Sequence, residues 1–312
     1  MPIRLGLHVT KFPSVDGVTG IFRRVVEQVR EAEAAGFHAA FVMDHFYQLP
    51  QLGAPDEPML EAYTALGALA AATEQIQLGA LVTGNTYRNP ALLAKAVTTL
   101  DVISQGRAIL GLGAGWYQHE HEHLGFKFGT FTERFAKLGE TIQIIVPMIR
   151  GDRPTYFGKY YHVTDAIAEP RFRSRIPLLI GGSGEKKTIP LAARHFDHLN
   201  IIANFDELPG KVAVARQACE DVGRDPKTLE TSVLVTVKVI GGAVVSDHIA
   251  RPSPHRVLTG PAESIADQVH SKVLAAGIDG VILNVLDYTP GVLVQLATAL
   301  GLADKDDVPC PR

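Results

Sequence analysis

Apolar and polar positions follow two patterns that alternate along the chain. Short apolar runs, typical of buried strands, each precede a longer segment with apolar residues every three or four positions, typical of an amphipathic helix. Strands are predicted at 3–9, 38–43, 76–83, 107–112, 176–180, 198–202, 231–239 and 280–285. Helices are predicted at 18–35, 60–73, 90–104, 131–150, 186–196, 207–222, 261–276 and 290–300.

A repeated strand–helix unit indicates an α/β fold with a parallel sheet, because each crossover helix must pack on that sheet. Eight units in a chain of 312 residues favour a single-domain (β/α)8 barrel (TIM barrel) over residues 1–312; an open doubly wound sheet is the alternative. Two segments are predicted insertions: 151–176 before the fifth strand, with a hairpin at 155–163, and 241–258 after the seventh. The stretch 113–129 is expected to be irregular.

Composition narrows the range of partners. The chain is 46% hydrophobic and 20% charged with a net charge of −3, so it lacks the basic surface that broad nucleic-acid binding needs. Cys219 and Cys310 are its only cysteines, which fits a reducing cytoplasm. The first residues are predicted to form a strand and lack the apolar core of a signal peptide, so no signal sequence is expected. The apolar runs at 65–72 and 91–100 are too short to span a membrane.

A glycine-rich turn, I-G-G-S-G-E-K-K at 180–187, joins the fifth strand to the following helix. Such a turn exposes backbone N–H groups at the positive end of a helix dipole, which favours an anion, most often phosphate. Lys186 and Lys187 add positive charge, beside Gly182, Ser183 and Gly184. The alternative is a tight turn that needs glycine only for its backbone angles.

Asp44 and His45 follow the second strand, on the face where active sites of this fold lie. Histidine exchanges protons near neutral pH, so the pair is a candidate for proton transfer. The structural alternative is that Asp44 caps the next turn while His45 bonds a backbone carbonyl.

Glycines mark the ends of the third and fourth strands. Gly79 inside a strand indicates a bulge or the close approach of a ligand, and Gly111, Gly113 and Gly115 leave one side of the strand end bare. A flat cofactor ring fits such a surface, with Trp116 as a wall. The alternative is that small residues serve barrel packing.

The run His119-Glu120-His121-Glu122-His123 invites a metal-site interpretation, because His119 and His123 share a helical face. The run is entirely polar, however, so a solvated helix face or loop is favoured and no metal site is assigned.

Several segments together resemble the luciferase-like flavin monooxygenase superfamily, and most closely its actinobacterial branch that uses the deazaflavin coenzyme F420. The matching segments are V-M-D-H-F at 42–46, L-G-A-L-V-T-G-N-T-Y-R-N-P at 78–90, G-L-G-A-G-W-Y at 111–117, E-H at 120–121, E-R-F at 133–135, I-G-G-S-G-E-K-K at 180–187 and D-G-V-I-L-N at 279–284. The resemblance covers nearly the whole chain.

The resemblance implies a barrel that binds an isoalloxazine-like ring at the carboxyl ends of its strands. It places a non-prolyl cis peptide at Leu81-Val82, behind the ring. It also implies a homodimer and a cofactor phosphate on the glycine-rich turn. The cofactor-binding residues it implies are Gly79, Leu81, Val82, Gly113, Gly115, Trp116, Gly182, Ser183, Gly184, Lys186 and Lys187.

The leading hypothesis is an oxidoreductase that transfers hydride between C5 of the deazaflavin and a small organic substrate, with a separate enzyme to reduce the cofactor. In this hypothesis His45 transfers the proton and Asp44 orients it, while Tyr47, Tyr117 and Tyr161 shape the substrate pocket.

Two alternatives remain: an FMN-dependent monooxygenase that uses O2 with a partner reductase, and a flavin- or deazaflavin-binding protein without catalysis. The deazaflavin carries a longer acidic tail than FMN, so its site should be richer in basic groups. Arg171, Arg173 and Arg175 either meet such a tail or lie in a solvated loop.

Overall fold

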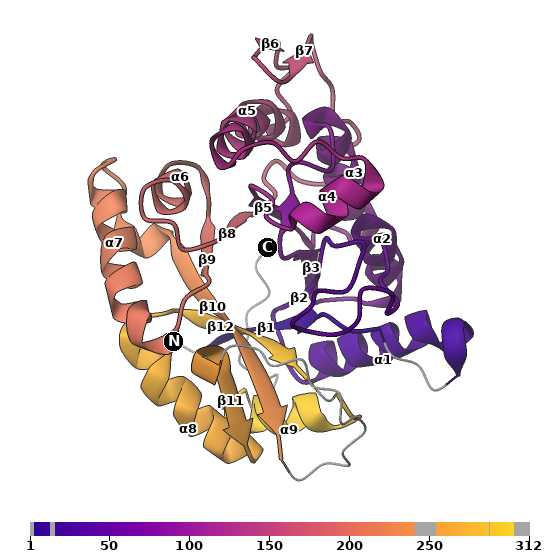
Figure 1. Ribbon diagram of the computed structural model, residues 1–312, viewed down its shortest axis with the longest axis vertical. Coiled ribbons are helices and arrows are strands. Elements are labelled where there is room, and N and C mark those ends of the chain that lie inside the picture. The colour runs from indigo at the N-terminus through magenta and orange to yellow at the C-terminus, as the bar shows by residue number, and fades with distance from the viewer. Residues whose placement is uncertain (1–2, 13–15, 241–253, 287, 303–312) are drawn as a thin grey trace.

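The computed structural model describes residues 3–12, 16–240, 254–286 and 288–302. Within these residues, eight parallel strands close into a barrel, because β12 pairs with β1 and β10 pairs with β9 (Figure 1). The barrel strands are β1 (Arg4–Val9), β2 (Ala39–Val42), β3 (Gln77–Ala80), β5 (Ala108–Gly113), β8 (Leu178–Gly181), β9 (His198–Ile201), β10 (Glu230–Val239) and β12 (Gly280–Val285).

Helices surround the barrel, as Figure 1 shows. They are α1 (Ile21–Ala34), α2 (Ala62–Ala72), α3 (Pro90–Ile103), α5 (Phe131–Arg150), α6 (Thr188–His195), α7 (Leu208–Glu220), α8 (Ala262–Lys272) and α9 (Val292–Ala299). A shorter helix, α4 (Gln118–Leu124), follows β5. Helix α5 has the predicted ends, because a Thr130–Glu133 capping box starts it and Gly151, at φ 97°, ends it.

Alternate residues of each strand face opposite sides of the barrel wall. Leu5 and Leu7 belong to the large core between strands and helices, whereas Phe41 and Ile282 belong to a small cluster inside the barrel. Because side chains fill the interior, a ligand site must lie on the rim. We call the rim at the carboxyl ends of the strands the barrel mouth.

The barrel prediction is confirmed, and the open-sheet alternative is wrong. The predicted strand at 76–83 is divided into β3 and β4 (Thr83–Gly84), which pairs with β5. The peptide bond Leu81-Val82 between them is cis, which confirms the position implied by the resemblance. The predicted hairpin is also present as β6 (Tyr156–Phe157) and β7 (His162–Val163).

Other boundaries differ from the predictions. Helix α4 occupies part of 113–129, which was expected to be irregular. Within the predicted insertion 241–258, residues 241–253 lie outside the described residues, while β11 (Val257–Gly260) begins inside it. Strand β10 extends beyond its last pair with β9, and its residues 236–239 pair with β11 instead. The ends of three predicted helices are 3-10 turns, at Gly17–Gly20, Phe205–Glu207 and Leu274–Ala276.

Two further sequence expectations concern cysteine and membranes. Cys219 is buried in α7, as its helical pattern predicts, whereas Cys310 lies outside the described residues. No helix in the described part of the chain has the length and apolar character needed to cross a bilayer.

Candidate active site

A buried carboxylate holds His45 at the barrel mouth. Nδ1 of His45 lies 2.8 Å from Oε2 of Glu120, which belongs to α4. An ionised carboxylate only accepts hydrogen bonds, so Nδ1 is the protonated nitrogen of the neutral ring. Nε2 has no hydrogen-bond partner within the described residues. It is therefore the ring nitrogen left to exchange a proton with a ligand.

Glu120 itself is fully buried and accepts three further hydrogen bonds. The amides of Phe46 and Tyr47 donate to Oε1 at 2.6 and 2.8 Å, and the Tyr87 hydroxyl donates to Oε2 at 2.6 Å. Burial alone would raise the pKa of this carboxyl, but the His45 interaction and the hydrogen bonds outweigh it and lower the pKa. Glu120 therefore stays ionised and fixes the segment after β2 to α4.

His121, next along α4, is also fully buried. Its Nδ1 donates to the Tyr117 carbonyl at 2.8 Å, and its Nε2 accepts from the Thr86 hydroxyl at 2.7 Å. The ring stacks on Tyr87 with centroids 4.5 Å apart. The expectation of a solvated polar run is therefore wrong at Glu120 and His121, the two residues that anchor α4 to the barrel.

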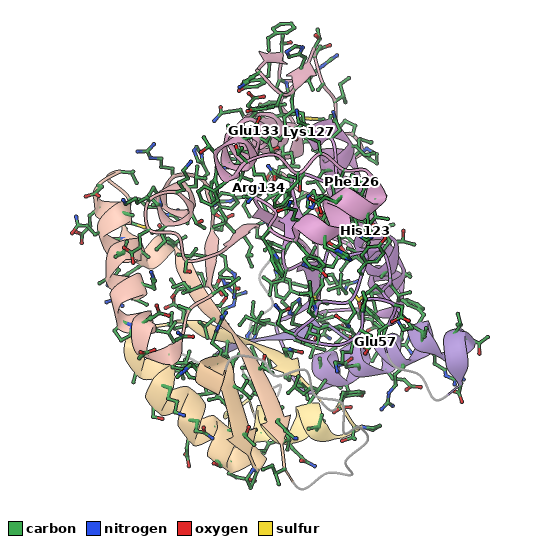
Figure 2. All side chains as sticks on the ribbon, in the orientation of Figure 1. Glu57, His123, Phe126, Lys127, Glu133 and Arg134 are labelled. Carbon is green, nitrogen blue, oxygen red and sulfur yellow. The ribbon has the colours of Figure 1, made fainter. Side chains whose placement is uncertain are left out.

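Phe126 completes this packing after α4. Labelled in Figure 2, it stacks on Phe46 with ring centroids 5.6 Å apart and meets the edge of Tyr87 with centroids 5.2 Å apart.

In the described part of the chain, no three His, Cys, Asp or Glu side chains are grouped as a metal site would require.

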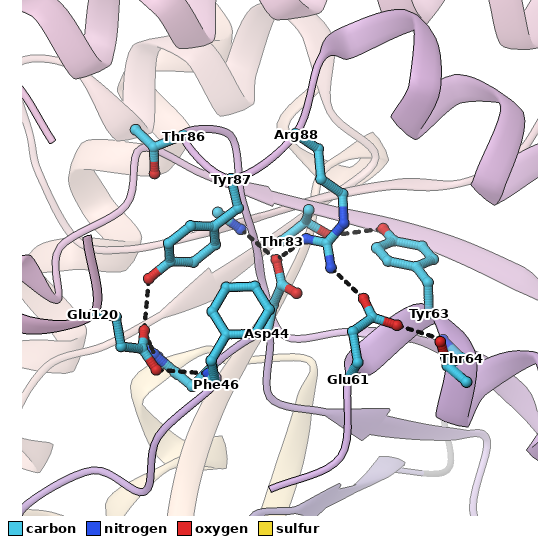
Figure 3. Close-up of polar contacts among 12 residues, drawn as sticks. Asp44, Phe46, Glu61, Tyr63, Thr64, Thr83, Thr86, Tyr87, Arg88 and Glu120 are labelled. Atoms are coloured by element: carbon cyan, nitrogen blue, oxygen red, sulfur yellow. Dashed lines mark hydrogen bonds and ion pairs between the residues drawn. The ribbon is translucent and has the colours of Figure 1, made fainter. Parts of the chain in front are cut away.

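Asp44 has a different partner from the one predicted. Its Oδ2 accepts from Arg88 at 2.6 Å and from the Gly84 amide at 3.0 Å (Figure 3). The prediction that Asp44 orients His45 is therefore wrong: Glu120 occupies that role. Burial raises the pKa of Asp44 against the opposing effect of Arg88, and Oδ1 is buried without a hydrogen-bond partner among the described residues.

Aromatic side chains surround His45. Trp116 is 55% exposed although it is large and apolar, and its ring centroid lies 5.6 Å from that of His45. Tyr117 lies at 5.8 Å. The ring of Tyr47 instead lies against His119 and His123, with centroids 5.9 and 6.4 Å apart. Tyr161 does not join the group either, because its hydroxyl contacts the Asn85 carbonyl at 3.4 Å.

The strand-end glycines serve packing rather than a bare surface for a ring. A Cβ added to Gly113 would lie 2.7 Å from Cγ2 of Val82, and one on Gly111 would lie 2.1 Å from the Ala80 carbonyl oxygen. A Cβ on Gly79 would likewise meet the backbone of β5. The expectation that these glycines leave a strand side bare is therefore wrong.

The remaining residues predicted at these strand ends have definite places. Leu81 and Val82 are partly buried against the cluster inside the barrel, so they close its interior from the mouth. Gly115 has φ 80° and packs against Thr86, since an added Cβ would lie 2.6 Å from Oγ1.

The glycine-rich turn follows β8 and has unused donors. Gly182, at φ 137°, donates its amide to the Asn200 carbonyl at 2.9 Å. In the described residues, the amides of Ser183, Gly184 and Lys186 donate to no protein acceptor. These amides, just before α6, are available to donate to an anion.

The three arginines before β8 lie on the opposite rim, where the strands begin. Arg173 donates to the carbonyl of Ala108, the first residue of β5, at 2.6 Å. Each of the three is paired with an acid: Arg171 with Glu169, Arg173 with Asp101 and Arg175 with Asp197. Their proposed contact with an acidic cofactor tail is therefore wrong.

Comparison with known proteins agrees with this geometry. A model of the family described as luciferase-like monooxygenase matches residues 3–243. The chain belongs to the luciferase-like monooxygenase family. The match includes β2, β5, α4 and the glycine-rich turn, so the His45–Glu120 pair lies within the family domain.

Relatives and solved structures extend the comparison. The chain is 38% identical over 160 residues to an F420-dependent glucose-6-phosphate dehydrogenase of Microbacterium testaceum, covering 50% of this chain and 46% of that protein. Against the enzyme of the same name from Nakamurella multipartita it is 34% identical over 214 residues, covering 67% and 60%. The chain spans about half the length of the curated relatives it matches.

Two solved structures share the fold. An F420-dependent secondary alcohol dehydrogenase in complex with an F420-acetone adduct has a TM-score of 0.79 at 19% identity, covering 95% of this chain and 97% of that one. The long-chain alkane monooxygenase LadA has a TM-score of 0.78 at 15% identity, covering 96% and 91%. At such low identities these likenesses establish the fold alone.

Proposed function

We propose that this protein is an oxidoreductase that uses coenzyme F420 to transfer hydride to or from a small organic substrate. The proposal rests on the position of His45 at the barrel mouth, where buried Glu120 holds its ring and exposed Trp116 lies beside it. The names of the relatives support F420 as the cofactor.

The residues at the mouth fit such a cofactor. The free amides of the turn and the charges of Lys186 and Lys187 suit its phosphate. Leu81, Val82 and Trp116 offer partly exposed apolar surface to a flat ring. When bound, the deazaflavin supplies or accepts the hydride at C5.

The side chains of the protein handle the proton that accompanies the hydride. Glu120 keeps the proton of neutral His45 on Nδ1, so that Nε2 accepts a proton from the substrate during oxidation and returns it during reduction. Trp116 and Tyr117, whose rings lie beside that of His45, form walls around the reacting atoms and restrict water. Asp44 holds Arg88 and the Gly84 amide in place behind the site.

Anaerobic turnover tests this proposal. Oxidised and reduced F420 are mixed with the protein and a panel of sugar phosphates, secondary alcohols, ketones and activated alkenes, while cofactor absorbance is followed. We expect at least one compound to change the cofactor's oxidation state at a rate that depends on protein concentration. If no compound does so, a non-catalytic cofactor-binding protein becomes the better account.

A second candidate is an FMN-dependent monooxygenase, which the family name and the shared fold with LadA favour. It predicts oxygen uptake coupled to substrate oxidation with reduced FMN, whereas the F420 proposal predicts none. The monooxygenase needs a separate enzyme to reduce FMN, and the F420 proposal needs one to reduce F420 when hydride is transferred to the substrate. The family resemblance favours a homodimer.

A further inference from the structure

We propose that Tyr87 is a positioning residue that tunes the proton affinity of His45 through Glu120, an inference whose consequence for catalysis rests on the proposed function. The two side chains share one oxygen of the buried carboxylate. Nδ1 of His45 lies 2.8 Å from Oε2 of Glu120, and the Tyr87 hydroxyl donates to the same Oε2 at 2.6 Å (Figure 3). Tyr87 therefore acts on His45 through this shared acceptor.

The other oxygen of Glu120 is also fully used. Oε1 accepts from the amides of Phe46 and Tyr47 at 2.6 and 2.8 Å, so each carboxylate oxygen accepts two hydrogen bonds. An ionised carboxylate has about four acceptor positions, and protein donors fill all of them. Because Glu120 is fully buried, solvent does not compensate when one of these donors is lost.

The two donors on Oε2 compete for its negative charge. A carboxylate beside an imidazole favours the protonated, cationic ring. The Tyr87 hydroxyl opposes this effect, because a charge-assisted hydrogen bond disperses the charge of Oε2. Burial and the bond to Glu120 raise the pKa of Tyr87, so its hydroxyl keeps its proton and remains a donor. Without Tyr87, His45 would hold a second proton more firmly and accept one from a substrate less readily.

Packing holds the Tyr87 ring independently of its hydroxyl. The ring stacks on His121 with centroids 4.5 Å apart, and it meets Phe46 and Phe126 edge to face with centroids 5.0 and 5.2 Å apart. Phenylalanine can make the same three contacts. Tyr87→Phe therefore removes the donor to Glu120 and leaves the ring in place.

Other ionisable groups near the pair stay the same in this variant. Burial, with a smaller effect of His45, lowers the pKa of His8 to about 3, so His8 stays neutral while His45 titrates. The ionisable neighbours come from β1, from the segments after β2 and β4, and from α4 with the residue before it: His8, Asp44, Tyr47, Arg88, Tyr117, His119 and His121.

Titration of His45 in the protein without cofactor tests the inference. Protein labelled with ¹⁵N-histidine is followed by NMR between about pH 5 and 8, and the His45 signal is identified by its absence in His45→Asn. We expect the midpoint of the His45 titration to rise by about half to one pH unit in Tyr87→Phe, because Oε2 then bonds His45 alone.

Tyr288→Phe is the matched control. The Tyr288 hydroxyl also donates to a carboxylate, that of Glu31, at 2.7 Å, and it has no bond to Glu120 or His45 among the described residues. This variant should leave the His45 midpoint unchanged. An unchanged midpoint in Tyr87→Phe, or an equal rise in Tyr288→Phe, would overturn the inference.

A second substitution keeps the test open if Tyr87→Phe does not fold. Replacing Tyr87 with a tyrosine that carries fluorine beside the hydroxyl retains the bond and makes the hydroxyl a stronger donor. The His45 midpoint should then fall, and an unchanged midpoint would again overturn the inference.

The pH dependence of turnover links the inference to catalysis. In Tyr87→Phe, the acid limb of F420-dependent substrate oxidation should move to higher pH by the same amount as the NMR midpoint. A uniform loss of rate with no change in the pH profile would show a merely structural role and overturn the inference. Absence of turnover with every substrate in the unmodified protein would instead overturn the proposed function, while the NMR titration still decides whether Tyr87 tunes His45.

Discussion

Replacing Glu120 with Gln tests the buried carboxylate on which the site is built. The side chains have nearly the same shape, so the amide oxygen of Gln can still accept from the amides of Phe46 and Tyr47. Its NH2 group, however, then faces His45 Nδ1 and the Tyr87 hydroxyl, where the carboxylate accepted two hydrogen bonds. The substitution therefore changes charge and donor pattern without creating a cavity.

The expected loss of stability follows from these contacts. Hydrogen bonds to a charged group contribute about 1.5–3 kcal/mol each, against about 1 kcal/mol for neutral ones. Weakening the two bonds of Oε2 should therefore lower the free energy of unfolding by about 2 kcal/mol. The effect on turnover should be larger, because an NH2 donor at Nδ1 moves the ring proton to Nε2. A lost proton-transfer group costs about 10²–10⁴-fold.

Urea unfolding measures the first effect, and single-turnover absorbance of F420 measures the second. Glu122→Gln is the matched control, since Glu122 is exposed on the same helix and bonds only Gln118 among the described residues. It should change stability by less than about 0.5 kcal/mol and leave turnover unchanged. A Glu120→Gln protein with the stability and turnover of the control would refute the assigned role of the carboxylate.

Three more substitutions probe the mouth and the barrel. His45→Ala should reduce single-turnover rates about 10²-fold or more with little change in cofactor affinity; equal rates would exclude His45 as the proton-transfer group. Gly113→Ala should lower the free energy of unfolding by about 1–3 kcal/mol, because its Cβ meets Val82; a neutral effect in urea unfolding would contradict the packing role. Burial, with a smaller effect of His45, lowers the pKa of His8 to about 3, so the folded protein resists its protonation. Stability should therefore fall by about 1.4 kcal/mol per pH unit from pH 6.5 toward 3, and His8→Leu should flatten this slope in urea titrations at several pH values.

The barrel was predictable because its signals are local. Apolar runs and helical periodicity mark each unit, and the capping box at Thr130 and Glu133 fixes the start of α5. The position of the glycine-rich turn was also predictable, since a strand, glycines and a helix start are adjacent in the sequence. The contacts that orient His45 were not, because Glu120 lies far along the chain in a wholly polar run.

The wrong expectations have the same cause: the contacts involved join residues that are far apart in the sequence. Asp44 was assigned to its sequence neighbour His45, whereas its partner Arg88 comes from the segment after β4. Gly111 and Gly113 suggested a surface for a ring, but their neighbours are Ala80 and Val82 of the adjacent strand region. The E-H pair at 120–121, which extends the family resemblance, was the available signal that this polar run contains a functional residue.

Cofactor choice is the most direct test of the central claim. The apo-protein is titrated with F420 and, in parallel, with FMN, while quenching of fluorescence from Trp116, the only tryptophan, reports binding near His45. We predict micromolar or tighter binding of F420 and weak binding of FMN. The reverse preference would contradict the hydride-transfer account and favour the monooxygenase, and binding of neither would contradict the cofactor site itself.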